Sequence, residues 1–66
     1  MGSLAEALPQ EIERCQELLT AYKEIGPPGR FGATMIQNDI KEAIDSLASG
    51  DVVRMLRAYE TLKASC

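Results

Sequence analysis

Apolar residues recur at steps of three and four along the first third of the chain. At 100° per residue, such residues fall within an arc of about 80° on one side of a helix. Proline is favoured in the first turn of a helix, so Pro9 marks the expected start, and Gly26 marks the expected end. The pattern predicts an amphipathic helix over residues 9–25, preceded by a flexible segment over 1–7. The stripe consists of Leu8, Ile12, Cys15, Leu19 and Tyr22.

A second helix is predicted over residues 33–48. Its start has two candidates. Thr34 and Gln37 fit a capping box, and the chain can equally enter the helix near Arg30. Ile44 lies on one shoulder of the apolar stripe, and Met35 and Phe31 are displaced towards the other. The stripe itself is formed by Ile36, Ile40, Ala43 and Leu47.

The third helix is predicted over residues 52–64, after a compact corner. Gly50 suits the left-handed position that ends a helix, and Asp51 suits the cap that begins the next one. One broad apolar face is expected on this helix. It contains Val52, Met55, Leu56, Tyr59 and Leu62, and Val53 widens it.

No part of the sequence alternates with the period of two that marks a strand. Short corners make neighbouring helices antiparallel. The sequence therefore predicts an all-α fold, a small three-helix bundle running up, down and up, in which residues 1–66 form a single domain.

The corner between the first two helices, IGPPGRFGATMIQ, has three glycines spaced three apart. A phosphate-binding loop needs free backbone N–H groups and a preceding strand, whereas Pro27 and Pro28 remove two donors and a helix precedes them. We interpret the segment as a helix–helix corner in which Gly26 is left-handed and Pro28-Gly29 forms a type II turn. Gly32 would then allow close approach of the helices. Arg30 is kept as a candidate contact for an anion or a partner carboxylate.

Composition and charge narrow the function classes. The chain has 66 residues, 45% apolar, with a net charge of −3, which gives no electrostatic attraction to nucleic acid or to an anionic membrane. No apolar run is long enough to span a bilayer, and the first residues lack a secretory signal. If the first and third helices end at the same level, Cys66 lies roughly 15 Å from Cys15 along the axis. We therefore expect unbridged thiols and a cytoplasmic location.

Residues for catalysis are scarce. The sequence has no histidine, so the commonest general base and metal ligand are missing. Asp39, Glu42 and Asp45 are neighbours on the polar side of the second helix, which is typical of a solvated face. We predict no catalytic, metal or cofactor-binding residue, no cofactor and no enzymatic activity.

The stretch from Leu47 to Leu62, about a quarter of the chain, resembles the second half of a tetratricopeptide repeat. In that repeat a Gly-Asp corner precedes an aromatic residue about nine positions after the glycine, and here these are Gly50, Asp51 and Tyr59. The preceding helix departs from the repeat, with Asp39, Glu42 and Ser46 where Trp, Leu and Tyr are typical. The resemblance implies a helical hairpin, and the sequence holds no second copy that would build a solenoid.

Four apolar residues do not fit on the main stripes: Phe31, Met35, Ile44 and Val53. Either broad stripes pack against two neighbours, or these residues form an interface with another protein. The sequence favours a small non-catalytic helical protein–protein interaction module that self-associates as a homodimer. The alternative is a nucleic-acid-associated regulatory protein that acts as a dimer.

Overall fold

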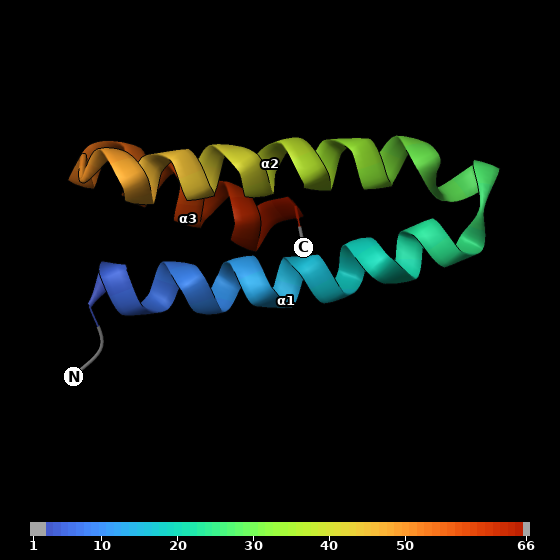
Figure 1. Ribbon diagram of the computed structural model, residues 1–66, viewed down its shortest axis with the longest axis horizontal. Helices are drawn as coiled ribbons and strands as arrows, with labels where there is room; N and C mark the ends of the chain where they lie inside the picture. The colour runs from blue at the N-terminus through green and yellow to red at the C-terminus, as the bar shows by residue number, and fades with distance from the viewer. Residues whose placement is uncertain (1–2, 66) are drawn as a thin grey trace.

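The computed structural model describes residues 3–65, and all of its regular elements are helical (Figure 1). Helix α1 covers Leu4–Ile25, the short 3-10 helix η1 covers Pro27–Gly29, α2 covers Arg30–Ser49 and α3 covers Val52–Ser65. Each of the three long helices contacts the other two. The predicted all-α, up-down-up bundle is confirmed.

Helix α1 begins five residues earlier than predicted, so residues 4–7 belong to the helix and Pro9 lies inside it. The first helical hydrogen bond runs from the Ala7 N–H to the Ser3 carbonyl, at 2.8 Å. Proline costs the helix one hydrogen bond, to the carbonyl four residues back. The fully buried Leu8 and the partly buried Leu4, one turn apart, offset that loss by packing on the core.

The corner between α1 and α2 differs from the predicted type II turn. Gly26 has a positive φ of 90°, as expected, but Gly29 has φ −88° and closes η1 by donating its N–H to the Gly26 carbonyl. Helix α2 then starts at Arg30, the second of the two predicted entries. Thr34 does not cap it, because the Thr34 hydroxyl donates to the Arg30 carbonyl from within the helix.

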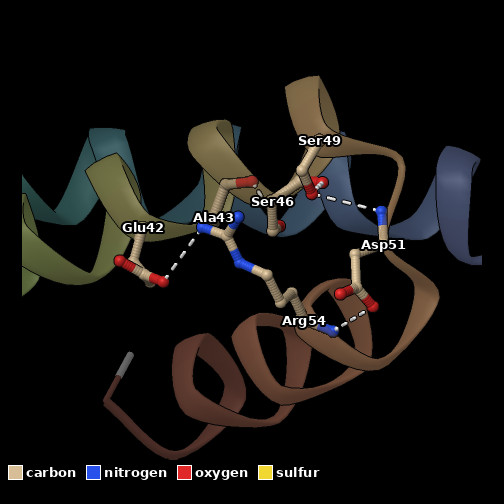
Figure 2. A network of polar contacts seen from close by, with 6 residues as sticks. All are labelled: Glu42, Ala43, Ser46, Ser49, Asp51 and Arg54. Atoms are coloured by element: carbon tan, nitrogen blue, oxygen red, sulfur yellow. Dashed lines mark hydrogen bonds and ion pairs between the residues drawn. The ribbon is translucent and has the colours of Figure 1, made fainter.

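The corner between α2 and α3 forms as predicted. Gly50 is left-handed, and the Asp51 carboxylate accepts hydrogen bonds from the N–H groups of Val53 and Arg54. The serine side chains of α2 extend this network (Figure 2): the Ser49 hydroxyl donates to the Ser46 carbonyl and accepts from the Asp51 N–H. The corner therefore fixes where α3 begins relative to the end of α2.

The core agrees with the predicted stripes on α1 and α2 and differs on α3. Helix α3 turns Ala58 inward, where it lies buried with Ala43 and Ser46. Small side chains allow two helices to pack closely. This rotation leaves Val52 and Leu56 exposed, although both were predicted to face the core. The buried cluster consists of Leu8, Ile12, Cys15, Ile36, Ile40, Ala43, Met55, Ala58 and Leu62.

Helix α3 is the shortest of the three long helices and ends about midway along the other two (Figure 1). Two contacts fix that level. The Leu62 carbonyl oxygen lies 3.7 Å from Cys15 Sγ, and the Ser65 hydroxyl donates to the Asp39 carboxylate at 2.8 Å. Beyond this level α1 and α2 continue as a two-helix hairpin. We call the part that α3 covers the proximal half and the rest the distal half.

The same contacts correct the prediction for the cysteines. Cys15 is disulfide-bonded. The sequence has one other cysteine, Cys66, which lies outside the described residues. The prediction of unbridged thiols failed because it placed the end of α3 level with the end of α1. In the structure α3 starts beside the start of α1 and is much shorter, so its end lies near Cys15.

Candidate interaction surface

The distal half of the hairpin has an apolar side that no helix of the described chain covers. The residues on this side follow the helical spacing of the residues that face α3 in the proximal half. They therefore lie on the same side of α1 and α2 as α3. Tyr22 and Leu18 are half-buried, and the other three are exposed. We call this surface the distal face, and it consists of Leu18, Tyr22, Ile25, Phe31 and Met35.

Two glycines hold the helices together beneath this face. A Cβ on Gly29 would lie 2.3 Å from the Tyr22 carbonyl oxygen and 3.2 Å from the Ile25 Cβ. A Cβ on Gly32 would lie 3.2 Å from the Tyr22 ring. Because neither glycine has a side chain, the Tyr22 ring packs directly on the backbone of α2. The distal half is thus closed by backbone contact in place of a third helix.

Among residues 3–65, Phe31 is the most exposed large apolar residue, with 78% of its surface accessible. An aromatic side chain offers about 150–250 Å² of contact surface, so Phe31 alone supplies a large part of the apolar area here. A patch of several such residues is typical of a protein contact surface.

The distal face itself contains no charged residue, although several lie nearby in the sequence. Lys23 and Arg30 line a depression on the other side of the hairpin, together with Gln37. Glu24 follows Tyr22 by two positions and therefore projects about 160° away from it. Recognition at this face must consequently rely on apolar contact and shape.

The four predicted interface residues are all exposed, but they do not form one surface. Phe31 and Met35 lie one turn apart on the distal face. Ile44 follows Met35 by nine residues and so lies on the opposite side of α2, in a groove with Leu19. The sequence reasoning missed Ile25 and Tyr22 as members of the distal face. The third helix was predicted to be shorter than the other two. That length was the signal, because a short helix leaves the end of the hairpin, with Ile25 and Tyr22, uncovered.

Val53 belongs to a second exposed apolar group, which we call the α3 stripe: Val52, Val53 and Leu56. Charged side chains alternate with it along α3, at Asp51, Arg54 and Arg57. The stripe also continues towards Tyr59, where the Lys63 ammonium lies 5.3 Å from the ring centre. Compared with the distal face, the stripe is narrower and is bordered by charges.

Arg30 was predicted to contact an anion or a partner carboxylate. It lines the depression at the corner, beside Lys23 and Gly26. Three backbone donors of this corner are already used: the N–H of Gly26 bonds to Lys23, that of Gly29 to Gly26 and that of Arg30 to Pro27. These three N–H groups are not free to bind an anion, and the Arg30 contact stays a prediction.

Two acidic residues of α2, Asp39 and Glu42, have partners on α3. Arg54 bonds to Glu42 at 3.4 Å, in a groove that Arg57 and Asp39 also line, and Asp39 accepts from Ser65 (Figure 2 shows the Glu42 pair). Residues 3–65 contain no cluster of three or more potential metal ligands. Because two carboxylates accompany the two arginines, the groove has no excess of positive charge.

Over residues 3–65, no helix combines the length and the hydrophobicity needed to cross a bilayer. Comparison of the chain with protein-family models, with curated proteins and with solved structures finds no match.

Proposed function

We propose that this chain is a non-catalytic helical module that acts by protein–protein contact through the distal face. One observation carries the proposal: α3 ends midway along the hairpin, so the side of α1 and α2 that needs a third helix presents Ile25, Phe31 and Met35 to solvent. A partner that covers this face would complete the packing that α3 provides in the proximal half.

The two halves differ in how much of their apolar surface is buried. Burying a large apolar side chain is worth about 1.5–3 kcal/mol, and the distal face leaves most of that free energy unused at three positions. Small domains are marginally stable. Exposed apolar surface of this size therefore promotes aggregation unless a partner covers it. A partner bound to the distal face would prevent this aggregation.

Site-specific photo-crosslinking in the native host tests the proposal. A photo-reactive residue at position 31 or 35 should give a defined covalent adduct, and one at position 44 should not. Position 44 is a matched control because Ile44 is also an exposed apolar residue of α2 on the opposite side. Adducts from position 44 but not from 31 or 35 would contradict the proposal, as would the absence of adducts at all three positions.

The alternative of a nucleic-acid-associated dimer gains no support from the groove between α2 and α3, where Glu42 and Asp39 accompany the arginines. It predicts binding to a DNA or RNA pool that weakens steeply with salt. A lack of binding at low salt removes it.

The expectation of a cytoplasmic location rested on unbridged thiols. Cys15 is disulfide-bonded, so the thiols no longer support that location. Disulfides persist mainly in oxidising compartments. Location stays a prediction. Thiol labelling of the protein from its native host, unfolded in denaturant without reductant, tests it: an alkylated Cys15 favours the cytoplasm, and a protected one favours an oxidising compartment.

A further inference from the structure

We propose that the partner of the distal face is a second copy of this chain, so that two hairpins pack face to face about a twofold axis with their helices antiparallel. This inference rests on the proposed function and specifies its partner. Each copy would place its distal half on that of the other, and the two pairs of α1 and α2 would form a short four-helix core.

The position of α3 makes this arrangement sterically self-consistent. Helix α3 occupies the shared side of the hairpin only in the proximal half, as the contacts of Leu62 with Cys15 and of Ser65 with Asp39 show. When two hairpins run antiparallel with only their distal halves overlapping, the α3 of each copy lies outside the overlap (Figure 1 shows the uncovered length in one copy). A long partner helix laid on the same face would instead collide with the end of α3.

The charge distribution is compatible with a second copy. The chain carries a net charge of −3, and a twofold contact brings each surface against itself. The outer side of α1 carries Glu13, Glu17 and Glu24, so its apposition would place like charges together. The distal face has no charged residue and meets its own copy without repulsion. A partner selected by charge would find no complementary group on it.

The area available predicts a weak dimer. Ile25, Phe31 and Met35 are 59%, 78% and 52% exposed, and with smaller parts of the half-buried Leu18 and Tyr22 the distal face offers on the order of 450 Å² per copy. The total of about 900 Å² lies at the low end of specific interfaces, where association is transient. Phe31 would be the main anchor, packing on the partner's Tyr22, because buried aromatic residues carry most of the energy of such contacts.

Sedimentation equilibrium of the purified chain from about 10 µM to 1 mM tests the inference, since weak dimers form in that range. The wild type should approach twice the monomer mass. Phe31→Glu and Met35→Glu should each raise the dissociation constant about tenfold or more. Ile44→Glu and Leu56→Glu should leave it unchanged. All four residues are exposed, so the variants should fold, and circular dichroism checks that they retain the helical content of the wild type.

Three outcomes would overturn the inference: a wild type that stays monomeric at 1 mM, equal weakening by Ile44→Glu, or weakening by Leu56→Glu alone. The last would place the contact on the α3 stripe. If the wild type is monomeric while position 31 still crosslinks in the native host, the partner is another protein, so this inference fails and the proposed function stands.

Small-angle scattering of the concentrated wild type then tests the arrangement. One copy is 37 Å long. An overlap limited to the distal halves, about 14 Å at 1.5 Å per residue, predicts a dimer about 60 Å long. A dimer no longer than about 40 Å would mean full side-by-side overlap and would contradict the antiparallel end-to-end arrangement.

Discussion

In its proximal half the α1–α2 hairpin carries α3, and its buried side chains include Leu8, Cys15 and Leu62, none of which reaches solvent. In its distal half the same two helices carry nothing further, and they are held by the contact of Tyr22 with Gly32. The two halves share the same two helices, and they differ in the presence of a third one. The difference shows that one short helix decides which part of the hairpin is core and which part is surface.

The largest expected effect separates core from surface. Leu62→Ala removes a fully buried side chain from the proximal half and should lower the free energy of unfolding by about 2–5 kcal/mol. Met35→Ala, in the distal half, should change it by less than about 0.5 kcal/mol in dilute solution. Urea unfolding of both variants measures the two values. Comparable losses would mean that Met35 is already buried and that the halves do not differ.

Reduction of the disulfide at Cys15 should have the next largest effect. Removing a native disulfide from a small domain costs about 2–5 kcal/mol, so a reductant should lower the melting temperature markedly. Cys15→Ala should melt at a low temperature with and without reductant, which separates the bond from general effects of the reagent. If the melting temperature of the wild type is the same with and without reductant, the disulfide contributes nothing to the stability of the proximal half.

The distal half should respond most to Gly29→Ala. The added Cβ would meet the Tyr22 carbonyl oxygen at 2.3 Å, a backbone atom that cannot rotate away, so the change should cost about 1–3 kcal/mol. Gly32→Ala should cost less, because its nearest neighbour is the Tyr22 ring at 3.2 Å, which can shift. Thermal melts of the two variants show which loses more stability. A larger loss of stability for Gly32→Ala would show that the backbone contact does not hold the hairpin together.

The smallest predicted effect concerns the corner that positions α3. Asp51→Ala removes the carboxylate that accepts from Val53 and Arg54 and should cost about 1 kcal/mol. Asp51→Asn should retain most of the stability, since asparagine also caps helices. If Asp51→Asn loses as much as Asp51→Ala, the cap is not the source of the effect.

The sequence was sufficient for those features that arise within one helix or one corner. The spacing of Ile36, Ile40 and Ala43 identified the buried side of α2, and Gly50 and Asp51 identified the second corner. These predictions succeeded because helical period and capping are local properties.

The features that depend on how helices sit against one another were not predictable in this way. The position along α1 at which α3 ends, beside Cys15, depends on the register between the two helices. The helical period of a sequence does not determine that register. The local preference of Pro9 indicates a helix start, whereas the packing of Leu4 and Leu8 that overrides this preference is tertiary. The exposure of Leu56 follows from the rotation of α3 towards Ala43, which is again a property of the assembled bundle.

Methionine oxidation offers a paired measurement of the central claim, that the distal face is uncovered in the single chain and becomes covered by its partner. Met35 is 52% exposed on the distal face, and Met55 is 7% exposed in the proximal core. In dilute solution peroxide should convert Met35 to the sulfoxide about ten times faster than Met55, because oxidation follows exposure. Near 1 mM the rate at Met35 should fall towards that of Met55. Equal rates in dilute solution, or a rate at Met35 that is independent of concentration and of any partner, would contradict the account.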